Sequence, residues 1–210
     1  MRRVLFIASV CFLLPLCAKA QDTPSAEVYG GYSFLHSETG RDLHGWNGSV
    51  AANLNKWFGL VVDVSGHYDS SSSNLVVTIP DFPTLPGLPP FAFRVRTNTK
   101  IHTIMVGPRV SYRKIEKITP FAHALFGVSR THTEAESRST GFESSSSDND
   151  TTFAMAVGGG LDVNLSKSFA LRVIQADYLY KRIGFERFGS DDIHHNLRAS
   201  VGIVFRFGGK

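Results

Sequence analysis

Thiols are nearly absent from this chain. Its two cysteines, Cys11 and Cys17, both lie in the first twenty residues, where Arg2 and Arg3 precede an apolar run and Ala18-Lys19-Ala20 follows it. This order is typical of a secretory signal that is cleaved after Ala20. The mature chain is therefore expected to lack cysteine, which excludes a disulfide, a thiolate metal site and a cysteine nucleophile.

Two alternative interpretations of this segment fit less well. The apolar run at 4–16 is too short for a retained transmembrane helix. A lipoprotein signal would place a small residue directly before Cys17, whereas this chain has the bulky Leu16. We therefore expect a signal peptide at 1–20 and a single barrel domain at 21–210, about 190 residues long.

The chain also lacks a strong charge of either sign and a helical membrane span. Removing the signal leaves 19 Lys and Arg against 18 Asp and Glu, a formal charge of +1 instead of +4. The basic isoelectric point is thus partly a property of the signal and gives no support to a nucleic-acid partner. No later stretch approaches the ~18 consecutive apolar residues of a spanning helix.

What the chain has in abundance is the two-residue alternation of β-strands. In the last run, 196–207, one set of alternate residues is apolar: Leu197, Ala199, Val201, Ile203, Phe205 and Phe207. The other set is mostly polar: Asn196, Arg198, Ser200, Gly202, Val204 and Arg206. Successive side chains of a strand point to opposite faces, so this strand has one apolar face. Its length is enough for a tilted strand to cross a bilayer.

Eight such strands are predicted, at 27–35, 46–54, 58–68, 100–112, 120–130, 151–165, 169–181 and 196–207. Short turns between them alternate with longer polar connections, of which 69–99 and 131–150 are the longest. This layout predicts an all-β fold, an eight-stranded antiparallel up-and-down transmembrane β-barrel. The serine runs at 70–73 and 144–147 are expected to be solvated loop.

The aromatic residues favour a membrane barrel over a soluble one. An aromatic girdle is expected near the short turns: Trp57, Phe58, Tyr112, Phe121, Phe169, Phe205 and Phe207. A second group lies toward the long connections: Trp46, Tyr68, Phe153 and Tyr178. Two belts that bracket an apolar band are typical of the two membrane interfaces. A soluble periplasmic barrel that binds a small apolar ligand remains the alternative, since it shows the same alternation inside out.

Five charged residues are expected to point into the lumen: Asp63, Arg109, Asp162, Arg172 and Arg198. Buried charges need partners, so we interpret this set as a structural network. An ion path is the alternative, less favoured because side chains fill the interior of an eight-stranded barrel. Arg172 and Asp177 have opposite parity, so both face inward only if a β-bulge lies between them.

No catalytic, cofactor-binding or metal-binding residues are predicted. His67, His102 and His123 would suit a lipid A-modifying enzyme only with a nucleophile in hydrogen-bond reach, and the chain has no G-x-S-x-G motif. His194-His195 beside Asp191-Asp192 is expected to be a solvated loop end, because adjacent side chains on a strand point apart.

Seven segments carry a family resemblance: GGYSF at 30–34, GWNGS at 45–49, NKWFG at 55–59, GPRVSY at 107–112, TPFAHALFG at 119–127, GGGLDV at 158–163 and LRVIQADY at 171–178. In order and spacing the chain resembles the small outer-membrane β-barrel proteins related to the OmpA transmembrane domain. The resemblance implies insertion by the outer-membrane assembly machinery, which reads a C-terminal aromatic. That residue would be Phe207, three residues before the end. We expect no peptidoglycan-binding domain after the barrel, so tethering to the cell wall is not carried over from the resemblance.

These observations predict a non-enzymatic protein of the cell outer membrane. Its expected role is structural or in surface interaction, with long extracellular loops and a polar lumen filled by side chains. The expected partners are outer-membrane lipid, the assembly machinery through the last strand, and an unidentified extracellular partner of the loops. A lipid A-modifying enzyme and a soluble ligand-binding barrel are the alternatives.

Overall fold

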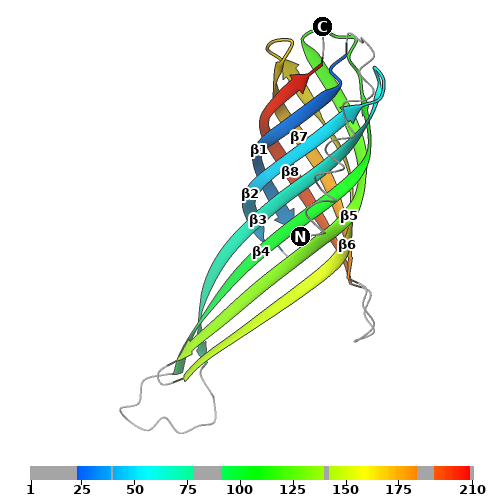
Figure 1. Ribbon diagram of the computed structural model, residues 1–210. Helices are drawn as coiled ribbons and strands as arrows, with labels where there is room; N and C mark the ends of the chain where they lie inside the picture. The colour runs from blue at the N-terminus through cyan, green and yellow to red at the C-terminus, as the bar shows by residue number, and fades with distance from the viewer. Residues whose placement is uncertain (1–22, 39, 78–90, 140–141, 184–191, 209–210) are drawn as a thin grey trace, which may run out of the picture.

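The computed structural model describes residues 23–208 except 39, 78–90, 140–141 and 184–191. Eight strands follow one another along the chain and close into a barrel (Figure 1). They are β1 Ala26–Ser37, β2 Asp42–Asn53, β3 Phe58–Val77, β4 Phe91–Ser111, β5 Ile118–Ser139, β6 Phe142–Asn164, β7 Phe169–Ile183 and β8 Asp192–Phe207. The predicted fold is confirmed, and the predicted signal peptide lies outside the described residues. The described residues contain no helix long and apolar enough to cross a membrane.

Every strand pairs antiparallel with its sequence neighbour, and β1 pairs with β8 to close the barrel. The β2–β3, β4–β5 and β6–β7 turns lie at one end, together with the start of β1 and the end of β8, where Ala26 is opposite Phe207. We call this the short-turn end. In the β2–β3 turn the Asn55 side-chain oxygen accepts hydrogen bonds from the backbone N–H groups of Trp57 and Phe58, both at 2.8 Å. An Asn in this position fixes a tight turn without help from other strands.

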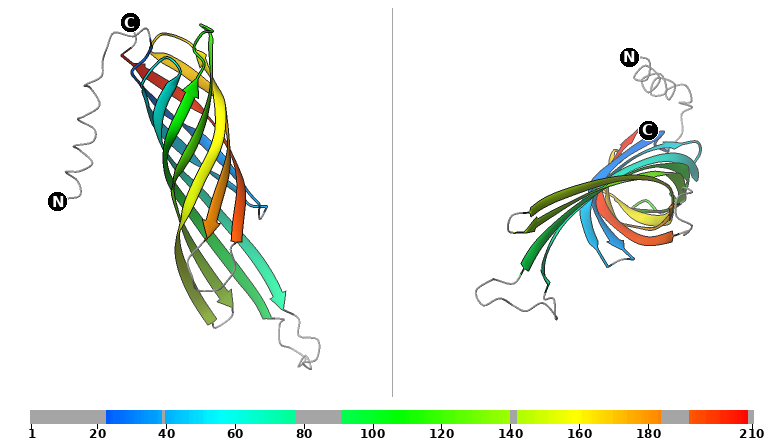
Figure 2. Two further views of the ribbon diagram at one scale, coloured as in Figure 1. Left: turned by 90° about the vertical axis from the view of Figure 1, so that its right-hand side faces the viewer. Right: turned by 90° about the horizontal axis from the view of Figure 1, so that it is seen from below.

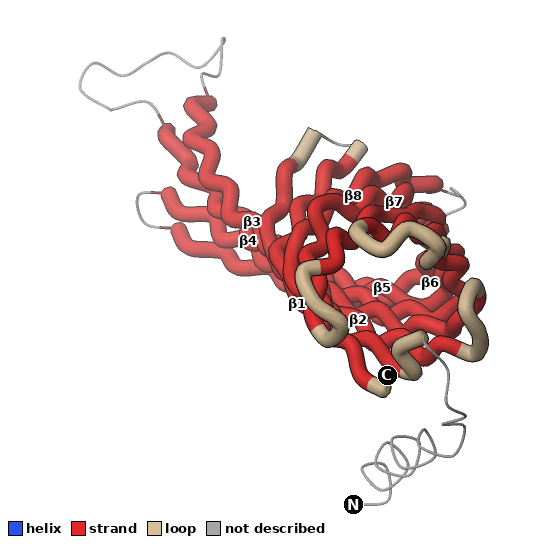
Figure 3. Tube along the Cα trace, turned by 90° about the horizontal axis from the view of Figure 1, so that it is seen from above, coloured by secondary structure: helices blue, strands red, loops and turns tan. Residues whose placement is uncertain are grey.

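Four strands are much longer than the other four. β3 to β6 contain 20 to 23 residues, whereas β1, β2, β7 and β8 contain 12 to 16. The last β2–β3 pair is His44 with Tyr68, and the first β6–β7 pair is Phe153 with Arg182. Beyond these pairs β3 to β6 continue as a four-stranded sheet that projects from one side of the barrel (Figures 2 and 3). We call it the protruding sheet: 69–77, 91–99, 131–139 and 142–152.

The protruding sheet corrects the prediction of long loops at 69–99 and 131–150. Only 78–90 and 140–141 separate these strands, and both connections lie outside the described residues. Both serine runs, at 70–73 and 144–147, are strand rather than loop. The two-residue pattern used to find strands depends on one face being apolar. Stretches that are polar at both odd and even positions, such as 69–74 and 143–152, do not show it.

Side chains alternate between the outside and the interior, as predicted for the last strand. On β8 Val201 and Ile203 are 47% and 40% exposed, whereas Arg198 and Ser200 between them are 1% and 2% exposed. The apolar set therefore covers the outer wall, and the charges lie inside. A soluble barrel would bury the apolar set instead, so that alternative is wrong.

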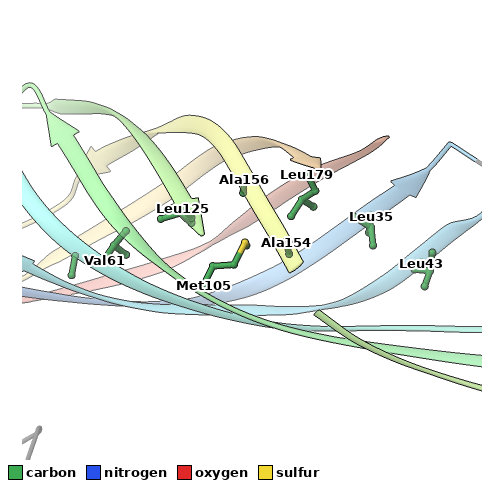
Figure 4. Packing of buried hydrophobic residues seen from close by; sticks show 9 residues of the cluster. Leu35, Leu43, Val61, Met105, Leu125, Ala154, Ala156 and Leu179 are labelled. Atoms are coloured by element: carbon green, nitrogen blue, oxygen red, sulfur yellow. The ribbon is translucent and has the colours of Figure 1, made fainter. Parts of the chain in front are cut away.

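The interior is not uniformly polar. A buried apolar cluster combines large side chains from six strands with small ones. Its members are Leu35, Leu43, Ala51, Val61, Met105, Leu125, Ala154, Ala156 and Leu179 (Figure 4). Polar and apolar side chains together fill the barrel.

Candidate functional site in the barrel interior

The interior holds equal numbers of opposite charges. Four carboxylates are buried there, those of Glu27, Asp63, Asp162 and Asp177. Four guanidinium groups are buried with them, those of Arg109, Arg172, Arg198 and Arg206. All eight are at most 9% exposed. The set includes the five predicted interior residues, and the structure places each of them in an ion pair.

One group of these charges lies toward the short-turn end. Arg109 Nη1 is 2.9 Å from Glu27 Oε2, and its Nη2 is 3.4 Å from Asp162 Oδ2. Arg172 donates from Nε to Asp162 Oδ1 at 2.8 Å. Arg113, at the barrel mouth, donates to Glu27 Oε1 at 3.0 Å. Each carboxylate is thus shared by more than one guanidinium, so no single arginine is its only partner.

Phe121 belongs to this group and not to the aromatic girdle, which corrects the prediction. It is 6% exposed, and the guanidinium carbons of Arg109 and Arg172 each lie 4.2 Å from its ring centre. The face of an aromatic ring carries negative charge and attracts cations. The other girdle residues described as exposed are Trp57, Phe58, Tyr112, Phe205 and Phe207. Phe169 packs edge-on against Phe205, with 5.2 Å between ring centres.

A second group of charges is centred on Arg198. Its Nη1 donates to Asp63 Oδ1 at 2.8 Å, and its Nε and Nη2 donate to Asp177 Oδ2 at 2.9 and 2.7 Å. His123 Nε2 is 2.7 Å from the other oxygen of Asp177. Asn47 donates to Asp63 Oδ2 at 2.8 Å. One arginine therefore connects two carboxylates from β3 and β7.

A β-bulge in β7 joins the two groups. The β7–β8 register shifts between Arg172 and Gln175, and both intervening residues, Val173 and Ile174, point outward. Gln175 accepts a hydrogen bond from Arg172 and donates one to Asp177, both at 2.7 Å. Because of the bulge, Arg172 and Asp177 both face the interior although they have opposite parity along the strand. The consecutive Val173-Ile174 pair, between polar residues that face inward, was the sequence signal for it.

Sequence reasoning also missed Glu27, which alternates with Tyr29 and Ser33 on the inner face of β1. Its burial among Arg109, Arg113 and Arg206 makes it the anionic centre of the group near the short turns. The alternation of the EVYGGYSFL segment, 27–35, was the available signal.

The histidines considered for catalysis are separated in space. His102 is on the outer wall, whereas His67 and His123 are buried. Ser33 Oγ and His67 Nε2 are 2.9 Å apart, but Ser33 is 0% and His67 1% exposed. A lipid substrate outside the barrel has no contact with that pair. Within the described residues no group of three or more His, Cys, Asp and Glu side chains could hold a metal ion. The side chains of His194, Asp191 and Asp192 lie outside the described residues.

Known proteins agree with this architecture. Over residues 5–207 the sequence matches the family model of the outer membrane protein beta-barrel domain. No curated protein sequence matches the chain. A crystal structure of Ail, the attachment invasion locus protein of Yersinia pestis, in complex with the heparin analogue sucrose octasulfate, superposes with a TM-score of 0.54 at 18% identity, covering 88% of this chain and 99% of Ail. A second crystal structure of Ail gives 0.52 at 17% identity with the same coverage. The chain belongs to the outer membrane protein β-barrel family and is located in the outer membrane.

Proposed function

We propose that this protein is a structural outer-membrane barrel that presents the protruding sheet at the cell surface for contact with an extracellular partner. In outer-membrane barrels the short turns face the periplasm. The protruding sheet starts at the opposite end of the barrel, so it extends into the medium. The observation that carries the proposal is that four strands continue well past their neighbours as a paired sheet.

The protruding sheet offers two free edges to a partner. Among the residues that the structure describes, β3 has no β2 residue opposite it past Tyr68, and β6 has no β7 residue opposite it before Phe153. Such edges expose unpaired backbone donors and acceptors, which can pair with an extended segment of another chain. Ser70, Ser71 and Ser72 on one edge and 144–149 on the other are exposed and polar. Short polar side chains keep a free edge soluble and leave its backbone accessible.

The interior supports a structural role rather than transport. Among the side chains that are less than 2% exposed are the large ones of Arg198, Leu43, Met105 and Leu125. They come from strands all around the barrel, and the charged ones are held by ion pairs. An eight-stranded barrel is only wide enough for its own side chains. We therefore propose a plug and expect no sustained conductance in planar bilayers.

The experiment compares the full protein with a trimmed variant. Two-residue turns replace 70–98 and 131–150, which joins Asp69 to Thr99 and Arg130 to Thr151 across existing strand pairs. Both proteins should fractionate with the outer membrane and run faster on unheated than on heated gels. Cells that carry the full protein should adhere to immobilised heparin more strongly than cells with the trimmed variant. Heparin is the probe because a heparin analogue is bound in the Ail structure.

Two results would contradict the proposal. Protein found in the soluble periplasmic fraction, with equal gel mobility before and after heating, would contradict the assignment as a membrane barrel. Equal adhesion of the two strains to heparin and to cultured host cells would remove the role of the protruding sheet while leaving the barrel intact.

A further inference from the structure

A compact polar cluster lies on the outer wall where the apolar band meets the protruding sheet. Tyr68 of β3 is opposite Lys100 of β4, and His102 of β4 is opposite Arg130 of β5. Lys100 and His102 are two residues apart on the same face of β4. All four side chains are exposed. We call these four residues the rim cluster.

Aromatic rings lie close together beside the cations. Trp46 Nε1 donates to the hydroxyl of Tyr68 at 3.4 Å, and the His102 ring lies edge-on to Tyr68 with 5.7 Å between ring centres. Gly66 lies beneath these rings. A Cβ atom there would be 2.7 Å from Trp46 Nε1 and 3.0 Å from the Tyr68 hydroxyl. The glycine therefore lets both rings lie across β3.

The positive charges of Lys100 and Arg130 in the rim cluster are available to a ligand. In the part of the chain that the structure describes, neither Lys100 nor Arg130 forms an ion pair with a carboxylate. The acidic group that faces Lys100 is Glu134, and its Oε1 is already 3.0 Å from His132 Nε2. Opposite Arg130 on β6 is Thr151, which carries no charge.

Directly toward the membrane, the same strands present only apolar groups on the outer wall. Ile104 and Val106 follow His102 on β4 and are 55% and 45% exposed. Val128 and Phe126 precede Arg130 on β5 and are 52% and 45% exposed. Acyl chains that pack on this wall would bring their headgroup level with the rim cluster.

We propose that the rim cluster binds the phosphate group of an outer-leaflet lipid, with Lys100 and Arg130 as cations and Tyr68 and His102 as hydrogen-bond donors. The apolar wall selects a lipid over a soluble phosphate, because it supplies contacts only to a ligand that carries acyl chains. Interfacial Lys and Arg residues attract anionic headgroups by the same electrostatics in other membrane proteins. This site goes beyond the proposed surface role, since it lies on the barrel wall and uses neither edge of the protruding sheet.

Native mass spectrometry of the full protein, refolded in detergent, tests the proposal. The probes are bisphosphorylated lipid A and the same lipid A without phosphates. The wild type should retain the phosphorylated form preferentially. In the double variant Lys100→Gln/Arg130→Gln that retention should fall by roughly thirtyfold, as expected for two interfacial cations. The matched control Arg96→Gln/Lys167→Gln loses the same charge from the protruding sheet and a short turn, and it should bind like the wild type.

Equal retention of the two lipids by the wild type would overturn the proposal, as would an unchanged affinity in the Lys100→Gln/Arg130→Gln variant. Heparin could also displace lipid A from the wild type at concentrations that leave lipid A bound to the Arg96→Gln/Lys167→Gln control. That result would assign the rim cluster to a soluble polyanion and overturn the lipid assignment. Mobility before and after heating shows that each variant is folded. Adhesion of cells with the double variant should stay at the wild-type level, which separates this proposal from the surface role.

Discussion

The four long strands, β3 to β6, form part of the barrel wall and then continue as the protruding sheet, so the same strands pass through two different surroundings. Inside the barrel, every carboxylate of the charge network has at least one guanidinium nitrogen within 3.0 Å. In the protruding sheet, single polar residues such as Ser70 and Ser146 stand in water. Removing a partner is costly only where water cannot replace it. Replacing an arginine or a serine should therefore lower the free energy of unfolding much more in the interior than in the protruding sheet.

The largest effect is expected from Arg198→Leu. This change leaves Asp63 and Asp177 buried without their shared guanidinium, a loss of about 3–5 kcal/mol of unfolding free energy. The measurement is urea unfolding in detergent, followed by the gel mobility of the folded barrel. Arg96→Leu is the control, because Arg96 is exposed in the protruding sheet. An equal midpoint for the wild type and Arg198→Leu would reject the interior network.

Arg109→Leu should also destabilise the barrel, but by less, about 2–3 kcal/mol. The reason is that its carboxylates keep other partners: Glu27 retains Arg113, and Asp162 retains Arg172. The same urea titration compares it with Arg198→Leu. If Arg109→Leu is the more destabilising of the two, the remaining guanidinium partners of Glu27 and Asp162 do not compensate for the loss of Arg109.

The sequence predicted the strands and inner faces wherever the two faces of a strand differ. The strands that contain Asp63, Asp162 and Arg198 show this. Lipid covers one face of each strand and packed charges lie on the other, so apolar and polar residues alternate strictly. Phe121 was misplaced because Ala122, Ala124 and Phe126 on the other face of β5 are no less apolar than its own face. The protruding sheet was missed because most of its residues, at 69–74, 131–139 and 143–152, are polar at odd and even positions alike. No local pattern specifies which guanidinium meets which carboxylate, since partners such as Arg198 and Asp63 are 135 residues apart.

A matched pair of serine substitutions compares the two regions by the loss of a single hydroxyl group. Ser33→Ala removes a buried hydrogen-bond partner of His67, at 2.9 Å, and of Ser200, at 3.0 Å. It should cost about 1–2 kcal/mol. Ser146→Ala removes an exposed hydroxyl from the protruding sheet and should stay within about 0.5 kcal/mol of the wild type. Chemical unfolding of both variants under one set of conditions gives the difference, and equal costs would contradict the contrast between the regions.

The smallest effect concerns the protruding sheet itself. His132 Nε2 is 3.0 Å from Glu134 Oε1, and its Nδ1 is 2.9 Å from Asn149 Oδ1. Both neighbours are oxygen acceptors, which only the doubly protonated ring satisfies together. The hydrogen bond to Glu134, followed by that to Asn149, raises the pKa of His132, and the hydrogen bond to His132 lowers the pKa of Glu134.

The sign of the resulting pH dependence follows from these two shifts. The contact is complete between the lowered pKa of Glu134 and the raised pKa of His132, and it is lost above the second value as the ring loses its proton and below the first as the carboxyl gains one. An NMR titration of labelled histidines should show His132 titrating above an ordinary histidine, and Glu134→Gln should move it back down. Since the pair is exposed, the unfolding midpoint of the barrel should not follow this titration. A midpoint that did follow it would mean that the protruding sheet and the barrel unfold as one unit, which would remove the energetic distinction between the two regions.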